Sequence, residues 1–208
     1  FINNLIYSRI KEKYFVSEFI YNKYISQFGK TEKQIILFPI DIPKEKVIFD
    51  SHKVKKVLFV GNFLDYKDPM TLIKAIETIK NKISLQVIMV GEGELKSKME
   101  KYISNHNLKE IFRIIEPLEK KELEKYYLQS DVFVLPSKEE AYGIVVLEAL
   151  SYGLPVVTTR SGGPSKFINE NKNGYLVKKE NPVQLGNAII KAIINQKRLG
   201  KNARILDK

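Results

Sequence analysis

Two glutamates stand at the start of an expected helix, in a setting that suits ligand recognition. Glu140 lies in a loop, and Glu148 falls within residues 144–152, an apolar run that only Glu148 and Ser151 interrupt. A helix that is apolar almost all round is expected to be buried, where a carboxylate is costly unless it is paired or hydrogen-bonded. We therefore expect Glu148 to need a hydrogen-bond donor from outside its own helix, and the hydroxyls of a ribose would serve.

The residues between these two glutamates offer a site for a phosphate. Tyr142, Gly143 and Ile144 occupy the expected helix start, where free backbone N–H groups and the helix dipole attract anions. Gly143 would let the backbone come close to a ligand. Taken alone, Glu140 would be a solvated loop charge and Glu148 a residue at the rim of the core. Their spacing and setting together favour a binding site.

A lysine in a second loop could hold the same phosphate. Lys67 ends the segment Gly61-Asn-Phe-Leu-Asp-Tyr-Lys67, which follows the apolar run 57–60. An ammonium group is a common ligand for phosphate oxygens. A loop lysine on its own is more often solvated, so this interpretation depends on its agreement with the glutamates.

These loops belong to a regular alternation of strands and helices that begins at Val57. We expect strands at 57–60, 85–90, 111–115, 132–135, 155–158 and 175–177, and helices at about 69–80, 95–105, 120–129, 144–152 and 183–194. Continuous apolar strands separated by helices indicate a parallel sheet covered on both faces, which is a doubly wound α/β domain. Ligands bind beyond the carboxyl ends of such strands, where the candidate loops lie.

The first part of the chain has a different organisation. A short strand at 14–16, a helix at 18–28 capped by Ser17, and a strand at 35–38 precede an irregular linker at 39–56. We therefore divide the chain into 1–53, a remnant of another domain with its linker, and 54–208, the α/β domain. The chain begins with Phe rather than Met and in the middle of a pattern, so we expect a piece of a longer protein.

The ordered motifs resemble one enzyme family. Pro136-Ser, Glu140-Ala-Tyr-Gly, Leu147-Glu-Ala and Gly153-Leu-Pro-Val are similar to the paired-glutamate region of retaining GT-B glycosyltransferases of the family 4, group 1 type. Ala141 and Tyr142 replace the usual Gly and Phe. The segment Gly61–Lys67 is similar to the family's Gly-Arg-Leu-x-x-x-Lys loop, with Asn62 in the arginine position.

Three weaker similarities follow the same order along the chain. Val90-Gly-Glu-Gly-Glu94 resembles the family's Gly-Asp-Gly turn, and Arg113–Leu118 lies where the family receives the base, with Glu116 in place of Gly. Ser161–Ile168 resembles the Gly-Gly-x-x-Glu stretch, although Lys166 replaces its Glu.

The resemblance implies a Rossmann-like C-terminal half of a GT-B fold, joined to a remnant of the N-terminal acceptor domain. It implies that Glu140 contacts the donor sugar, that Lys67 holds the diphosphate and that Glu148 binds the ribose. Lys67 and Glu140 are the expected catalytic residues. The expected donor-binding residues are Gly61, Asn62, Lys67, Ile115, Glu116, Leu118, Glu140, Ala141, Tyr142, Gly143, Ile144 and Glu148.

The implied reaction moves a sugar, of hexosyl type, from a nucleoside-diphosphate donor to a hydroxyl of a sugar or lipid-linked acceptor, with retention of configuration. The isolated chain is expected to be inactive, because most of the acceptor domain is missing. The alternative is a non-catalytic nucleotide-sugar-binding subunit that needs a separate acceptor-domain partner; Asn62 and Lys166 favour it. A degenerate copy that binds nothing is a further alternative.

Composition narrows the remaining classes. The chain has no cysteine, which excludes disulfides and thiolate chemistry, and its two histidines are far apart. No Asp-x-Asp pair is present, so we expect no essential metal and no cofactor beyond the donor substrate. The net charge of +11 is spread along the chain rather than gathered in a block, so we expect no nucleic-acid binding. We expect a cytoplasmic protein, with peripheral contact at the inner face of the membrane left open.

Overall fold

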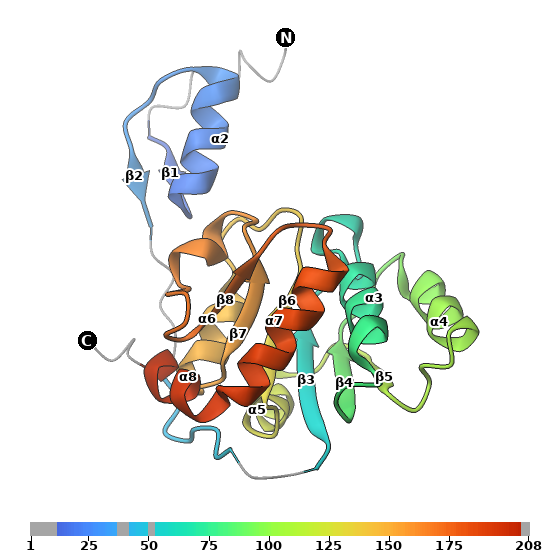
Figure 1. Cartoon of the computed structure of the whole chain (residues 1–208). Coiled ribbons are helices and arrows are strands. Elements are labelled where there is room, and N and C mark those ends of the chain that lie inside the picture. The colour runs from blue at the N-terminus through green and yellow to red at the C-terminus, as the bar shows by residue number, and fades with distance from the viewer. Residues whose placement is uncertain (1–11, 37–41, 50–52, 205–208) are drawn as a thin grey trace.

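A six-stranded parallel sheet forms the centre of the molecule, as the computed structural model shows (Figure 1). The structure describes residues 12–36, 42–49 and 53–204. Its strand order is β5-β4-β3-β6-β7-β8. The strands are β3 (Lys55–Val60), β4 (Leu85–Val90), β5 (Phe112–Ile115), β6 (Val132–Leu135), β7 (Val156–Thr159) and β8 (Gly174–Val177). The expected parallel α/β sheet is therefore confirmed.

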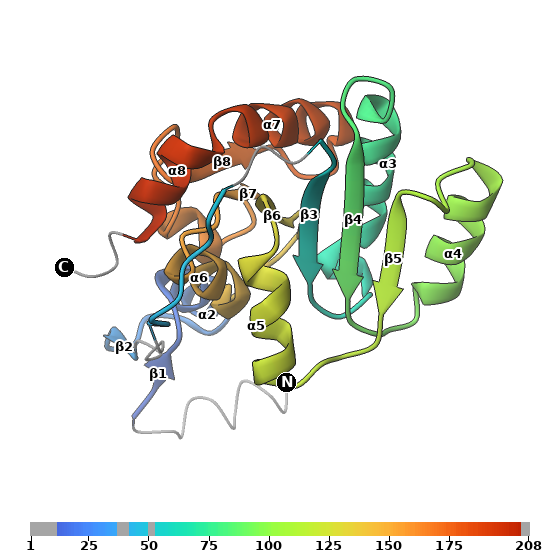
Figure 2. The same cartoon turned by 90° about the horizontal axis from the view of Figure 1, so that it is seen from below.

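Helices cover both faces of this sheet (Figure 2). On one face lie α3 (Pro69–Ile79) and α7 (Pro182–Ile194), and on the other lie α5 (Lys120–Leu128) and α6 (Ile144–Ser151). Helix α4 (Lys96–Asn105) lies beyond β5, and α8 (Gln196–Ala203) follows α7 and contacts α6. The doubly wound architecture predicted from the sequence is thus the one observed.

Buried apolar side chains and side-chain caps at the helix N-termini stabilise these layers. Leu58, Phe59 and Phe133 of the central strands are fully buried in one continuous core. Helix α3 begins at the N-cap Asp68, whose carboxylate accepts a hydrogen bond from the Thr71 backbone N–H at 3.2 Å. The closeness of α3 and α7 depends on Gly186, since a Cβ there would lie 2.8 Å from the Thr78 Oγ1. The sheet is therefore a firm base for the loops at its carboxyl edge.

The N-terminal unit, defined here as residues 14–36, lies over that carboxyl edge (Figure 1). It consists of β1 (Tyr14–Phe15), α2 (Glu18–Phe28) and β2 (Gln34–Ile35), with β1 and β2 paired in parallel. Ser17 caps α2 by accepting a hydrogen bond from the Ile20 backbone N–H at 3.3 Å. The expected strand at 35–38 is shorter, and its residues 37 and 38 lie outside the described part of the chain.

Residues 42–49 of the linker contact the α/β domain. Within residues 42–49, the Val47 backbone N–H donates to the Tyr152 carbonyl at 2.9 Å. Arg204 donates to the Pro43 carbonyl at 2.7 Å. Phe49 lies against Gly200, where a Cβ would come within 2.3 Å of its ring. These contacts hold residues 42–49 against the domain.

Other features also differ from the sequence expectations. Strand β3 begins at Lys55 instead of Val57, because the Lys55 side chain pairs with Asp131 and both lysines continue the register with β4. A 3-10 turn, η1 (Asp65–Lys67), lies within the first candidate loop. Helix α8 was not predicted, although its buried residues Gln196, Leu199, Gly200 and Ala203 follow a helical spacing, because a glutamine and a glycine occupy two of these positions. None of the helices in the described residues is long and apolar enough to cross a bilayer.

Candidate functional site

The candidate loops meet where the winding of the sheet reverses. From β3 the chain moves outward through β4 to β5, and from β6 it moves outward in the other direction through β7 to β8. The loops that follow the neighbouring strands β3 and β6 therefore border the same crevice at the carboxyl edge. Such a switch point is the general ligand position in open α/β sheets.

Lys67 and Glu140 come together at this point from opposite sides of the crevice. The Lys67 ammonium contacts the Glu140 carboxylate, although the two residues are 73 positions apart. Their side chains are only 15% and 11% exposed. The two residues line a pocket of about 490 Å³ together with Tyr66, Glu139 and Ala141. The predicted catalytic pair is thus brought into one pocket, where a bound anion would compete with Glu140 for the lysine.

Backbone hydrogen bonds fix the position of Glu140. Its N–H donates to the Ser161 carbonyl at 2.9 Å, and its carbonyl accepts from the Gly163 N–H at 2.9 Å. The neighbouring Lys138 N–H donates to the Tyr66 carbonyl at 2.8 Å, which ties the loop after β6 to the loop after β3. The loop that carries Glu140 is therefore tied by backbone hydrogen bonds to the loop after β7 and to the loop after β3.

The start of α6 is shaped by protein contacts. Gly143 has a φ of 89°, and a Cβ there would lie 2.6 Å from the Pro164 ring. Glycine is therefore required at this position for both its backbone conformation and its packing. Tyr142 is buried and meets Phe167 edge-on at a centroid distance of 5.3 Å. Ile144 is exposed. Close approach of a ligand to Gly143 stays a prediction.

Glu148 has a hydrogen-bond donor from outside its own helix, as expected, and this donor is a side chain of the protein. The additional contact with a ribose stays a prediction. The Tyr127 hydroxyl, on α5, donates to the Glu148 Oε2 at 3.0 Å. Burial raises the pKa of Glu148 above its ordinary value, while the bond from Tyr127 acts in the opposite direction. Burial also raises the pKa of Tyr127 well above its usual range, so the phenol remains a donor. The sequence did not identify Tyr127 as the donor, because it lies on another helix, 21 positions away.

The Tyr127→Phe variant is expected to lower the free energy of unfolding by about 1 kcal/mol at neutral pH, because Glu148 loses its donor. The pKa of Glu148 is raised, so Glu148 becomes neutral at a higher pH than an ordinary glutamate. A neutral carboxyl group forms a weaker bond with the phenol, and the loss should therefore shrink as the pH falls towards 4.5. Urea unfolding at several pH values measures it.

Tyr126→Phe is the matched control, since the Tyr126 hydroxyl forms no hydrogen bond with the residues that the structure describes. Equal losses in the two variants would contradict a specific role for the Tyr127 hydroxyl.

The other predicted donor-binding residues lie around the edge without lining this pocket. Asn62 is exposed in the loop after β3. The backbone of Gly61 packs tightly against Gly91, since a Cβ on Gly91 would lie 2.1 Å from the Gly61 carbonyl oxygen. The segment Val90–Glu94 is thus packed against the first candidate loop. This packing accounts for the glycine at position 91, and no ligand is needed to explain it.

The segment after β5 lies at the far side of the same edge. The Ile115 carbonyl accepts a hydrogen bond from the Gly91 N–H at 2.9 Å. Glu116 is exposed and pairs with Lys96, and Leu118 packs against the core. The contact of these residues with the base of the donor nucleotide stays a prediction.

Sequence reasoning missed four residues that bear on the site. Tyr66 and Glu139 line the pocket, and each is adjacent to a predicted residue. Tyr127 donates a hydrogen bond to Glu148 from 21 positions away, and no sequence pattern near either residue predicts that bond. Ser17 was identified only as a helix cap, yet its hydroxyl also donates to the Ala141 carbonyl at 2.5 Å.

Comparison with known proteins agrees with the fold and the motifs. A family model described as glycosyl transferases group 1 matches residues 41–205. An uncharacterized glycosyltransferase of Methanocaldococcus jannaschii is 29% identical over 194 residues, covering 90% of this chain and 53% of that protein. The chain therefore spans about half the length of this relative.

Solved structures show the same fold. The chain superimposes on a mutant form of S. aureus TarM, solved with UDP among its ligands, with a TM-score of 0.85 and 24% identity, over 95% of this chain and 40% of that one. Anabaena Alr3699/HepE, solved with UDP and glucose, gives a TM-score of 0.85 and 18% identity over 98% and 60% of the two chains. These structures are GT-B glycosyltransferases, and their C-terminal Rossmann-like domains match the sheet described above. With the family model spanning most of its length, the chain belongs to the group 1 glycosyl transferases.

Proposed function

We propose that this chain is the donor-binding half of a retaining glycosyltransferase that takes a nucleoside-diphosphate sugar. The observation that carries the proposal is the meeting of Lys67 and Glu140 in one pocket at the switch point of the sheet. A cation for the diphosphate and a carboxylate for the sugar hydroxyls are the two groups that such a donor needs. The position of both on separate, hydrogen-bonded loops supports a preformed site.

We propose UDP as the nucleotide part of the donor. Its support is the presence of UDP in the TarM and HepE structures, which share this fold. In the bound state Lys67 would leave Glu140 for the diphosphate, and Glu140 would be free to accept hydrogen bonds from the sugar. Glu148 would offer the oxygen that Tyr127 does not occupy to the ribose.

Catalysis would depend on positioning and on charge stabilisation at the departing diphosphate. Lys67 and the N-terminus of α6 are the groups proposed for this role. We propose transfer of a hexosyl group to a hydroxyl of a sugar or lipid-linked acceptor, in the cytoplasm. The acceptor would be held by a domain of which the N-terminal unit is a remnant, so the chain alone should not turn over an acceptor.

A nucleotide-sugar-binding subunit without its own catalysis is the second candidate. Asn62 favours it, because this exposed amide stands where the family has a phosphate-binding arginine. Such a subunit would bind the donor and would need a partner that supplies the acceptor site.

Calorimetric titration of the purified chain with UDP, GDP and ADP tests the proposal. We expect UDP to bind most tightly and the affinity to stay the same in EDTA, since no metal is proposed. Failure of all three nucleotides to bind would reject both candidates. Transfer to an acceptor hydroxyl by the chain without a partner would reject the assignment as an incomplete half.

A further inference from the structure

Three consecutive residues of the N-terminal unit contact the loops that frame the donor pocket. The Ser17 hydroxyl donates to the Ala141 carbonyl at 2.5 Å. The Glu18 carboxylate pairs with Lys166 at 2.7 Å. Phe19 packs directly on Gly162, where a Cβ would come within 2.8 Å of its ring. One short segment therefore reaches both the loop after β6 and the loop after β7.

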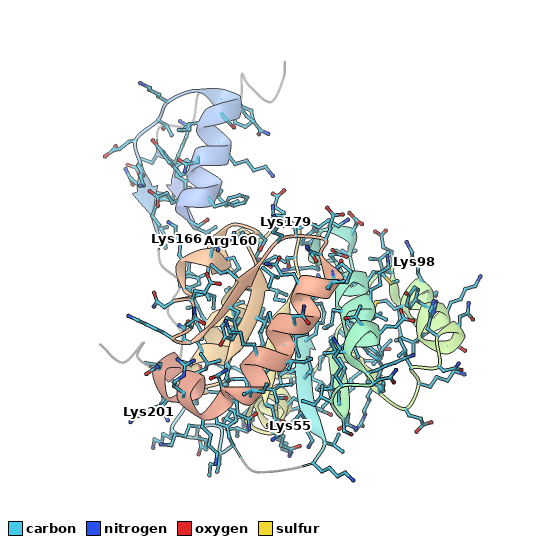
Figure 3. All side chains as sticks on the ribbon, in the orientation of Figure 1. Lys55, Lys98, Arg160, Lys166, Lys179 and Lys201 are labelled. Atoms are coloured by element: carbon cyan, nitrogen blue, oxygen red, sulfur yellow. The ribbon has the colours of Figure 1, made fainter. Side chains whose placement is uncertain are left out.

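Ion pairs also join the N-terminal unit to the loops around the pocket. Glu18 also pairs with Lys33, and the two lysines lower the pKa of Glu18 to about 2. Lys23, on the next turn of α2, pairs with Glu139 of the pocket. In Figure 3 the labelled Lys166 and Arg160 lie at the end of the domain that faces the N-terminal unit, whereas Lys55 and Lys201 lie at the opposite end.

Ser17 is the buried centre of this contact, being only 4% exposed. The Ser17 oxygen accepts a hydrogen bond from the Ile20 backbone N–H at the start of α2, and the Ser17 hydroxyl donates a hydrogen bond to the Ala141 carbonyl. One side chain thus joins the helix to the pocket loop. Ala141 is bonded to Glu140, the carboxylate proposed to contact the sugar, so any shift of Ala141 is transmitted to Glu140.

The start of α6 is held in a different way. Gly143 packs on Pro164 and Tyr142 meets Phe167, and both partners belong to the segment after β7. Loss of the Ser17 contact should therefore disturb the part of the loop that holds Glu140 more than the part that begins the helix.

We propose that Ser17, supported by Glu18 and Phe19, is a positioning residue for the donor loop and sets the affinity for the sugar part of the donor through Glu140. The proposal rests on the function proposed above. It also assigns a role to Lys166, since this residue serves the contact with Glu18 instead of the role that a glutamate has in the family motif.

The first test uses hydrogen exchange in the ligand-free chain. The Lys138 and Glu140 amides are hydrogen-bonded to other loops, so their exchange reports the order of the donor loop. Ser17→Ala should raise their exchange rates at least fivefold, and Ser17→Thr, which keeps the hydroxyl, should leave them within twofold of wild type. Unchanged exchange in Ser17→Ala would overturn the proposal even if no nucleotide binds.

The second test compares UDP with a nucleotide sugar, taken as whichever of UDP-glucose and UDP-N-acetylglucosamine the wild type binds more tightly. Ser17→Ala should weaken the nucleotide sugar by five- to tenfold and UDP by less than twofold. Ser17→Thr should restore the ratio. Equal weakening of both ligands would indicate a general loss of structure and would overturn the proposed role.

A matched control separates positioning from helix capping. Asn181 caps α7 by accepting the Gln184 backbone N–H at 2.9 Å, and within the described residues no hydrogen bond joins it to the donor loop. Asn181→Ala should lower the melting temperature as Ser17→Ala does, while leaving the ligand ratio and the loop exchange unchanged. If Asn181→Ala also changes the ratio, the effect of Ser17 is one of stability alone. Absence of UDP binding in the wild type would reject the proposed function, whereas the exchange test would still decide the role of Ser17.

Discussion

The Lys67→Ala variant is expected to bind UDP about 30- to 150-fold more weakly than wild type, a loss of about 2–3 kcal/mol. Lys67 is 15% exposed, so its contact with a diphosphate would be made in a partly desolvated pocket. Asn62 cannot replace the missing charge. Truncation also leaves the Glu140 carboxylate without its cation next to the bound phosphates, and this repulsion adds to the loss.

Lys138→Ala is the matched control, because it removes the same charge from the same crevice. Lys138 bridges Asp65 and Glu180, at 2.9 and 3.4 Å, and does not line the pocket. We expect less than a threefold change in its UDP affinity. Calorimetry at low and at physiological ionic strength makes the comparison, since general charge effects decrease with salt. Equal losses in the two variants, or an unchanged affinity in Lys67→Ala, would return Lys67 to the role of a solvated loop lysine.

The second large effect distinguishes the two glutamates. Glu148→Ala is expected to weaken UDP and the nucleotide sugar by similar amounts, about 1.5–3 kcal/mol, because both ligands carry the ribose. Glu140→Ala should weaken only the nucleotide sugar. It also releases Lys67 from its ion pair, so UDP affinity should stay unchanged or increase. The comparison is internal to one set of titrations, and errors in absolute affinity largely cancel.

Melting temperatures of the ligand-free variants complete this experiment. Removing Glu148 takes a partly buried carboxylate out of the protein, which favours stability, and leaves the Tyr127 hydroxyl without its acceptor, which opposes it. If both variants weakened both ligands equally, the roles assigned to the two glutamates would be wrong. If neither variant changed either affinity while wild type bound, the site would lie elsewhere.

The elements of the sheet could be predicted closely because their signals are local. Residues 132–135 are a continuous apolar run, and residues 85–90 are apolar except for Gln86; the predicted bounds are those of β6 and β4. The turn η1 and helix α8 carry no such run. The division at residue 53 stays a prediction.

The site could be predicted only in part, since its contacts join distant segments. The motifs identified Lys67 and Glu140, but periodicity alone does not give the strand order that makes β3 and β6 neighbours. The bond from Tyr127 to Glu148 and the pair between Glu18 and Lys166 each cross between elements, over 21 and 148 positions. Such contacts arise from packing, and no residue near either partner indicates them.

The central position of β3 also bears on how the chain is made. One edge of β3 pairs with β4, which is complete at residue 90. The other edge pairs with β6, whose first residue follows the end of β3 by 72 positions (132 − 60). At ~5–20 residues per second, a ribosome needs roughly 4–14 s to supply that partner. During this interval an apolar strand presents unpaired backbone groups, the usual starting point for wrong pairing between chains. Synthesis therefore exposes β3 to aggregation before the pocket between the β3 and β6 loops can form.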